Sequence, residues 1–337
     1  MATATLETSL NGLGETGTHS ASASLGSGAM RWGAPASTAL PDWLRAQSVN
    51  AARHVSALRP FTREEFGIGS NLVAAPSEGH VQAANRLMQL LRRDLLNLTT
   101  RVEGAVDAAL QSPSPERLQA LMRRKERAHS WVQAVEKIWD FYFELFGQRQ
   151  SPFGTMLVSC DRIALDCYQT AFTNLGEAKS IPAPPPFSYM RTGFSPATYR
   201  RGIPLSKLGK QINPFPLVQL PYHRLVNPWT LGAVLHEVSH NLQNDLGLAR
   251  VIPLNIARRL LRDGFGKLTA SVWTRWNREL FADLSGLLLG GPSVIASLMD
   301  VVGRGPDSVL TFDPKGVHPT PFLRALSSNN NTVADMM

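Results

Sequence analysis

Apolar residues recur at alternating intervals of three and four positions through two long segments of this 337-residue chain. In 80–111 they are Val81, Ala84, Met88, Leu91, Leu95, Leu98, Val102, Ala105 and Ala109. In 115–147 they are Leu118, Leu121, Ala128, Val132, Val135, Trp139, Tyr142 and Phe146, and Lys125 is the one polar residue that interrupts the series. This spacing predicts two helices that each carry one continuous apolar seam. Ser114 and Pro115 favour a helix start at the second segment. We therefore expect residues 58–150 to form a long antiparallel helical hairpin.

The segments on either side of this hairpin differ in composition. Residues 1–57 are rich in Ser, Thr, Ala and Gly, which predicts a disordered tail because so few large apolar groups cannot offset the entropy of ordering. Residues 151–330 alternate helical and proline-rich stretches, which predicts a second domain, and a flexible C-terminus is expected at 331–337. The expected fold class is mainly α with a small mixed β-sheet, that is, α+β.

Three stretches of the second domain have sequence patterns that predict their local structure. Residues 152–174 are predicted to be helical, and Cys160 and Cys167 on this helix lie too far apart for a disulfide. The proline-rich segment 178–214, with "IPAPPPF", is expected to be extended and polyproline-like. The segment "PFPLVQLPY" at 214–222 predicts a short strand, and its prolines predict that it lies at a sheet edge.

The stretch "LGAVLHEVSHNLQNDLG" contains the motif HExxH. Its boundaries predict a helix, because Asn227 and Pro228 are typical of a helix start and Gly247 of a helix end. A chance occurrence of the motif on an ordinary helix is the alternative interpretation. The apolar flanks disfavour it, because burying two histidines and a glutamate is costly unless they are paired or coordinated.

The spacing of the motif suits a metal site. His236 and His240 lie one turn apart on one helix face, so both imidazoles can reach one ion. Glu237 stands beside the first histidine, where it can take a proton from a water molecule. This pattern predicts a zinc ion with a neighbouring general base.

Zinc in a catalytic site takes a third protein ligand and keeps one position open. The metzincin class is excluded, because Gln243 and Leu246 stand where it needs glycine and histidine. The segment "NRELFADLSG" at 277–286 offers Glu279 as the third ligand. Asp283, one turn later, can accept a hydrogen bond from a zinc-bound imidazole, which is the gluzincin arrangement. A solvated helix face is the alternative, and the apolar neighbours argue against it.

A third element is "GVHPTPFLR" at 316–324, where two polar side chains stand near an expected helix start. His318 or Arg324 can stabilise the oxyanion of a tetrahedral intermediate. A purely structural role for both residues is the commoner interpretation of such a pair.

In this order, HExxH at 236–240, RExxAD at 278–283 and HPxxxxR at 318–324 resemble the CAAX-prenyl-protease and HtpX-like family of zinc metallopeptidases. The resemblance covers roughly residues 215 to 328. It implies a zincin-like catalytic domain that follows the hairpin. It also implies roles for single residues: His236, His240 and Glu279 as zinc ligands, Glu237 as general base, Asp283 as the carboxylate behind the ligands, and His318 with Arg324 as helpers in the active site.

The expected function is a zinc metalloendopeptidase that hydrolyses peptide bonds with Zn2+ as cofactor and a protein or peptide as substrate. The strand 215–220, if it is an edge strand, would hold the substrate by strand addition. The alternative function is a zinc-containing adaptor or scaffold, an inactive protease fold that acts through its basic hairpin. Glu237 distinguishes the peptidase hypothesis from the adaptor hypothesis, because a structural zinc site needs no general base.

Charge adds a possible partner. The net charge is +8, and the run "RRKER" at 123–127 on the hairpin can meet an acidic protein or an anionic surface, although a solvated helix face is commoner. Nucleic acid is an unlikely partner, because no basic run is interleaved with aromatic residues. The N-terminus lacks a signal-peptide pattern, and 284–302 reads as a core helix and not a membrane span. A cytoplasmic location is expected, with export by a non-classical route left open.

Overall fold

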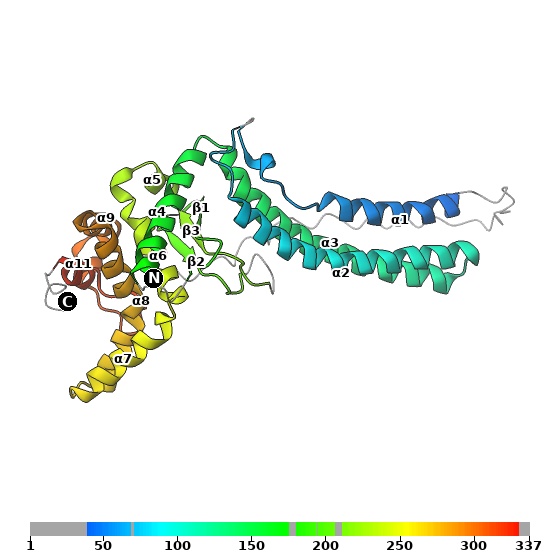
Figure 1. Cartoon of the computed structure of the whole chain (residues 1–337). Helices are drawn as coiled ribbons and strands as arrows, with labels where there is room; N and C mark the ends of the chain where they lie inside the picture. Colours follow the sequence, from blue (N-terminus) through cyan, green and yellow to red (C-terminus); the bar gives the residue numbers. More distant parts are fainter. Residues whose placement is uncertain (1–38, 69–70, 175–179, 194, 206–210, 330–337) are drawn as a thin grey trace, which may run out of the picture. The chain divides into compact units, whose positions relative to one another are not determined.

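The computed structural model describes residues 39–68, 71–174, 180–193, 195–205 and 211–329. It is mainly helical with a three-stranded mixed sheet, as Figure 1 shows, so the expected α+β class is confirmed. Over these ranges, none of the helices combines the length and the apolar character needed to cross a bilayer. The expectations for residues 1–38 and for the C-terminus at 331–337 lie outside the described residues.

The two predicted hairpin helices are confirmed. They are α2 (Glu78–Gln111) and α3 (Pro115–Gly147), and Ser114 caps α3 by accepting a hydrogen bond from the backbone N–H of Arg117. Their apolar seams are buried against each other, as the spacing requires. The same core continues into the sheet through Phe187, Phe215 and Leu217, among other buried residues.

The expectation of a disordered tail that reaches residue 57 is wrong for its last third. Helix α1 (Ala39–Ala57) occupies this stretch, and it buries Leu44, Gln47 and Val55. Leu44 belongs to the same apolar cluster as Leu121 of the hairpin. The average composition of residues 1–57 does not indicate this helix, because only a few apolar residues occur at helical spacing. These residues are buried only because α1 packs against a neighbouring element.

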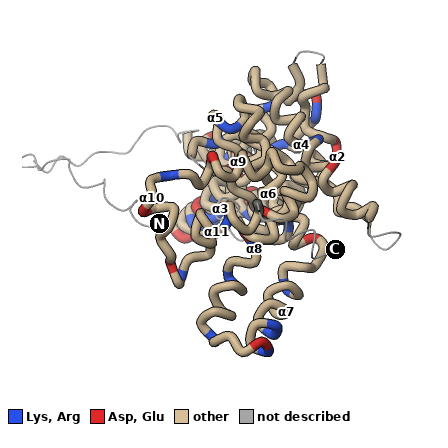
Figure 2. The backbone as a smooth tube through the Cα atoms, turned by 90° about the vertical axis from the view of Figure 1, so that its left-hand side faces the viewer, with Lys and Arg blue, Asp and Glu red and all other residues tan. Residues whose placement is uncertain are grey.

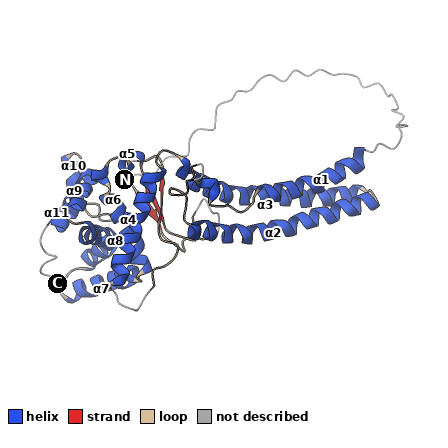
Figure 3. Cartoon of the chain, turned by 45° about the horizontal axis from the view of Figure 1, so that its top comes forward, coloured by secondary structure: helices blue, strands red, loops and turns tan. Residues whose placement is uncertain are grey.

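The sheet corrects the prediction of an edge strand. Its strands are β1 (Phe187–Met190), β2 (Ala197–Tyr199) and β3 (Leu217–Leu220), in the order β1-β3-β2 (Figure 1), and Figure 3 shows them in red among the helices. Strand β3 pairs parallel with β1 and antiparallel with β2, so it is the central strand. Pro216 and Pro221 stand just outside its four paired residues, and therefore no proline has to donate to either ladder.

The extended segment predicted at 178–214 is also wrong in part. It contains β1 and β2, and β1 buries Phe187 and Tyr189 in the core. Strands of four and three residues are too short to show a clear alternation in the sequence. Four of its prolines, at 182, 184, 185 and 186, stay in the connection that precedes β1.

The rest of the chain is helical and frames the candidate site. The HExxH helix begins after a short 3-10 turn at Pro228–Thr230 and ends at Asp245, two residues before Gly247, whose φ of 76° fits the predicted glycine stop. The predicted single helix at 284–302 is divided at Gly291 (φ 70°) between two helices. The helices are α4 (Gly154–Thr173), α5 (Tyr222–Leu225), α6 (Gly232–Asp245), α7 (Leu248–Arg262), α8 (Lys267–Gly290), α9 (Pro292–Val302), α10 (Pro306–Leu310) and α11 (Pro321–Asn329).

Two glycines of α8 allow α6 to approach closely. A Cβ added at Gly290 would lie 2.5 Å from Leu235 Cδ2, and one at Gly286 would lie 3.2 Å from Val294 Cγ1 and 3.7 Å from the backbone nitrogen of His236. Small residues at these two positions therefore set the separation of the helices that carry the HExxH and RExxAD motifs.

Candidate metal centre

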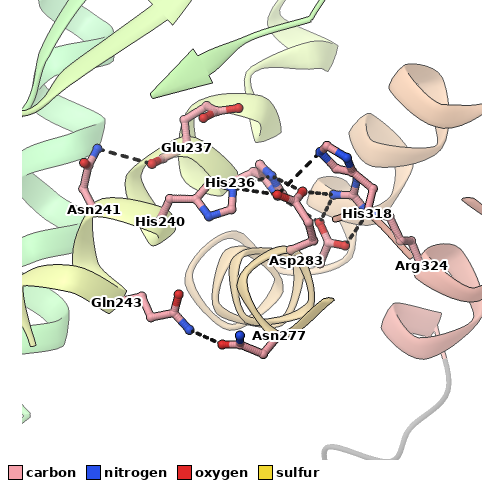
Figure 4. Close-up of polar contacts among 10 residues, drawn as sticks. His236, Glu237, His240, Asn241, Gln243, Asn277, Asp283, His318 and Arg324 are labelled. Atoms are coloured by element: carbon pink, nitrogen blue, oxygen red, sulfur yellow. Dashed lines mark hydrogen bonds and ion pairs between the residues drawn. The ribbon is translucent and has the colours of Figure 1, made fainter. Parts of the chain in front are cut away.

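Three side chains from two helices converge on one point. His236 and His240 project from α6, and Glu279 projects from α8. The two Nε2 atoms are 3.1 Å apart; Nε2 of His236 lies 3.5 Å from Oε2 of Glu279, and Nε2 of His240 lies 3.5 Å from the other oxygen, Oε1. Figure 4 shows both imidazoles turned toward α8. All three side chains are about 15% exposed, so the point where they meet is accessible from one side.

These separations suit a zinc ion. Zinc with ligands at 2.0–2.1 Å in tetrahedral geometry places neighbouring ligand atoms about 3.3–3.4 Å apart. The three measured separations lie on either side of that value. Two imidazole nitrogens and one carboxylate oxygen also match a donor set that zinc accepts, with a fourth position left for another ligand. In the described part of the chain this is the group of side chains whose ligand atoms gather closely enough to hold a metal.

Asp283 lies directly behind this group on α8. Its Oδ1 is 2.9 Å from Nδ1 of His236, so a proton on Nδ1 leaves the Nε2 lone pair free for a metal. Burial opposes protonation of His236, but contacts with Asp283 and Glu279 outweigh it and raise the pKa of its imidazole to about 10. Burial and the neighbouring His236 lower the pKa of His240 to about 4. The imidazoles of His236 and His240 can therefore hold one proton-borne positive charge between them, and protonation of the second ring is unfavourable.

Arg324 joins the centre from α11. Its Nε and Nη2 donate to the two oxygens of Asp283 at 2.8 and 2.7 Å, and Nη2 also lies 3.4 Å from Oε2 of Glu279. Both partners of the bidentate pair are almost fully buried. Burial raises the pKa of each carboxyl, but the contacts with His236 and Arg324 more than reverse this for Asp283 and Glu279, and both pKa values lie below the usual range.

His318 is the most exposed member of the predicted set. Its side chain is 62% exposed, and Nε2 lies 3.6 Å from Oε1 of Glu279. It therefore stands at the open side of the centre, where a bound substrate would be within its reach. Arg324, in contrast, faces the buried carboxylates.

Glu237 occupies a different side of α6. It is 6% exposed, and within the described residues its carboxylate makes no hydrogen bond or ion pair. In Figure 4 it lies apart from the pair of Asp283 and Arg324. Burial raises its pKa to about 7; His236 opposes this and Glu279 adds to it. An unpaired buried carboxyl with that pKa is suited to accept and release protons near neutral pH.

Two amide contacts that the sequence did not single out fix α6 in place. Gln243 donates to Oδ1 of Asn277 at 3.0 Å, and both side chains are buried between α6 and α8. Asn241 donates to Oγ1 of Thr198 at 2.6 Å and joins α6 to strand β2. A signal was present, because Gln243 and Asn241 are polar residues on a helix with apolar flanks.

Ion pairs and short contacts link six of the seven predicted site residues, which come from three separate segments of the chain. Glu237 lies on another side of α6, where its charge interacts with His236, Glu279 and Arg324 without a hydrogen bond among the described residues (Figure 4). Comparison of the chain with known protein families, curated proteins and solved structures finds no match. An assignment of function therefore depends on the chemistry of these residues and on their spacing.

Proposed function

We propose that this protein is a zinc-dependent metalloendopeptidase of the gluzincin type. The observation that carries the proposal is the spacing of the donor atoms: the Nε2 atoms of His236 and His240 are 3.1 Å apart, and each lies 3.5 Å from a different oxygen of the Glu279 carboxylate. When bound, zinc lowers the pKa of a water molecule to about 7 and polarises a carbonyl group. The order of the three motifs and their resemblance to the CAAX-prenyl-protease and HtpX-like family support the same conclusion.

The proton transfers fall to Glu237. Its carboxylate oxygen accepts the proton of the attacking water and delivers it to the nitrogen of the leaving amine. A pKa of about 7 suits both steps, because the group is a base before attack and an acid afterwards. A zinc site with a purely structural role has no use for an unpaired buried carboxylate, which disfavours the adaptor hypothesis.

Asp283 and Arg324 act as positioning residues. Asp283 fixes the tautomer and the ring orientation of His236, and Arg324 holds Asp283 and neutralises the surplus negative charge of the two carboxylates. His318, at the open side, is placed to donate a hydrogen bond to the carbonyl oxygen of a substrate.

The correction of the sheet order moves the expected substrate strand. Strand β3 is paired on both sides and has no free edge, whereas β2 is an outer strand. The contact between Asn241 and Thr198 holds β2 against the helix that carries Glu237. An extended peptide that pairs with β2 would lie along the open side of the zinc ligands.

The test begins with the metal content of the purified protein and its hydrolysis of a peptide library, with and without a chelator. We expect one zinc per chain and cleavage that the chelator abolishes. His240→Ala should lose the zinc, whereas Glu237→Gln should retain it and lose a factor of about 10² to 10⁴ in kcat/KM. Glu103→Gln, on an exposed face of α2, is the matched control and should retain both. Full activity of Glu237→Gln would refute the assignment of the base, and zinc with no cleavage of any peptide would favour the adaptor.

A further inference from the structure

The segment between the two ligand-bearing helices has a strong charge bias. Residues 248–276, which form α7 and the first part of α8, contain six basic residues and one acidic residue, Asp263. Figure 2 shows the basic positions along α7 and around the turn into α8. The basic residues are Arg250, Arg258, Arg259, Arg262, Lys267 and Arg275.

Most of these charges have no partner. Asp263 pairs with Arg259 at 2.7 Å, and Arg275 bonds to Ser271 and to the carbonyl of Pro314. The other four basic side chains make no ion pair and no hydrogen bond within the ranges that the structure describes. They are Arg250, Arg258, Arg262 and Lys267, and all four are exposed.

Large apolar side chains are exposed in the same place. Helix α7 contains no buried residue. At the turn, Leu261 is 49% exposed, Phe265 is 52% exposed and Leu268 is 68% exposed. Val251 and Leu254 continue this apolar surface back along α7, each about half exposed. Solvated helix faces do not concentrate such residues, so the combination indicates a binding surface.

We propose that this turn docks onto an anionic lipid surface. The basic tip, defined as Leu261, Phe265 and Leu268 together with Arg258, Arg262 and Lys267, places its cations against lipid phosphates and its apolar side chains at the boundary between headgroups and acyl chains. The chain bends at Gly264, whose φ is 86°, so the apolar residues gather at a turn where a flat surface can be reached.

The charge pattern favours lipid over a protein partner. Lysine is depleted in protein interfaces, and the cations of the tip share the turn with a single acidic residue, Asp263, which Arg259 already binds, so the tip presents one sign of charge to a uniformly anionic surface. An anionic headgroup layer satisfies both kinds of side chain at once. The binding needs no metal and no catalysis, so it goes beyond the proposed peptidase activity.

The same chain offers a matched comparison in the arginines of α3. Arg123 and Arg127 are exposed like those of the basic tip, but the exposed large apolar side chains beside this stretch are fewer, namely Met122 and Trp43, whose ring centroid lies 5.9 Å from Nζ of Lys125. A surface that binds through charge alone would use either region. A surface that also needs apolar insertion would use the basic tip.

The experiment is sedimentation of the full chain with vesicles of phosphatidylcholine alone and of phosphatidylcholine mixed with phosphatidylserine. We expect binding to the mixed vesicles only. Binding should weaken as added salt screens the charges. The triple variant Arg258→Gln, Lys267→Gln and Arg262→Gln should bind roughly a hundredfold less tightly. The triple variant Leu261→Ser, Phe265→Ser and Leu268→Ser should also lose most binding, and its circular dichroism should match the unchanged chain.

The variant Arg123→Gln with Arg127→Gln should bind like the unchanged chain. Failure of the unchanged chain to bind the mixed vesicles would overturn the proposal, as would loss of binding in the α3 variant alone. A chain that self-associates without vesicles, and becomes monomeric when the three apolar residues are replaced, would also overturn it in favour of a second copy. None of these measurements depends on peptide hydrolysis, so each result stands whether or not the chain proves to be a peptidase.

Discussion

The helical hairpin and the candidate metal centre are stabilised in opposite ways. The hairpin of α2 and α3 packs a long series of apolar residues, so each contributes a share of one non-directional interaction. The centre between α6, α8 and α11 depends on a few polar contacts, each made by one side chain at one distance. The hairpin can lose a side chain and keep its arrangement, whereas the centre has no substitute for any member.

The two regions also differ in what the substitution of one side chain leaves behind. An apolar side chain removed from the seam leaves a void, and its cost follows the volume lost. A polar side chain removed from the centre leaves its partner buried and unpaired, and the cost then follows the charge that remains. Four substitutions test this contrast, from the largest expected effect to the smallest.

Arg324→Ala should be the most damaging of the four. It leaves Asp283 buried with a negative charge and no bidentate partner, so we expect a loss of about 3–5 kcal/mol in the free energy of unfolding. Urea denaturation measures this loss. Arg45→Ala is the control, because its pair with Asp42 is fully on the surface, and its effect should be within about 0.5 kcal/mol. Equal losses for the two variants would contradict the view that the centre depends on this contact.

Leu121→Ala should cost somewhat less, about 3 kcal/mol, because it opens a void in a seam where the side chain is fully buried. Zinc content should remain unchanged, since the residue lies in the hairpin and not in the centre. Leu96→Ala, at a half-exposed position on α2, is the control and should change stability little. A loss of metal in the Leu121 variant would show that the two regions are not independent.

At one end of the hairpin, the buried side chain of His80 depends on specific polar contacts, as the side chains of the metal centre do. The ring bonds to Oγ of Ser77 at 2.7 Å and to the carbonyl of Pro185 at 2.8 Å, and burial lowers the pKa of His80 from 6.5 to about 4. At pH 7 both the folded and unfolded states hold a neutral ring. Below pH 6.5 the unfolded chain takes up a proton that the folded chain resists, so stability falls as the pH falls to about 4, by up to about 3 kcal/mol.

The measurement is the slope of unfolding free energy against pH between 6.5 and 4, compared for the unchanged chain and His80→Gln. The variant should show a shallower slope, because the titrating group is gone. Val81→Ala, at a neighbouring buried position, should lower stability and keep the original slope. If His80→Gln keeps the original slope, the acid sensitivity lies elsewhere.

Gly286→Ala should have the smallest effect on stability and little effect on the metal. The added methyl would be 3.2 Å from Cγ1 of Val294, so α9 has to shift slightly away from α8, at a cost of about 1–2 kcal/mol. Its distance of 3.7 Å from the backbone nitrogen of His236 is an ordinary contact, so zinc affinity measured by chelator competition should change little. Gly104→Ala on α2 meets nothing within 4 Å and should instead stabilise the protein slightly, by about 0.5–1 kcal/mol. The same sign for both variants would contradict this account of helix spacing.

The sequence predicted those features that depend on local spacing. The seam of the hairpin placed α2 and α3 to within two residues, and the HExxH spacing placed His236 and His240 on one face. Helix α1 was missed because its burial depends on the hairpin and not on its own composition. Strand β3 was placed at an edge because the sequence does not reveal which neighbours a four-residue strand will have.

For contacts between distant segments, the sequence could name candidate residues but could not show which of them touch. Glu279, Asp283 and Arg324 were selected by motif, but the bidentate contact of Arg324 with Asp283 and its distance from Glu279 come from the packing of α11 against α8. The structure pairs Nε and Nη2 of Arg324 with Asp283, and the oxyanion role expected for Arg324 stays a prediction. The tie between Gln243 and Asn277 was not identified at all, because nothing local pairs two amides that are 34 positions apart.

Among the contacts of the centre, those of Arg324 are the last that can form during synthesis. As the polypeptide is synthesised, α6 and α8 emerge with both histidines and both carboxylates before α11 exists. Until α11 arrives, the carboxylate of Asp283 lacks its bidentate partner, although its Oδ1 can already contact Nδ1 of His236. A nascent chain therefore carries every proposed metal ligand before the surplus negative charge of the two carboxylates is balanced, and that balance comes only when synthesis has passed residue 324.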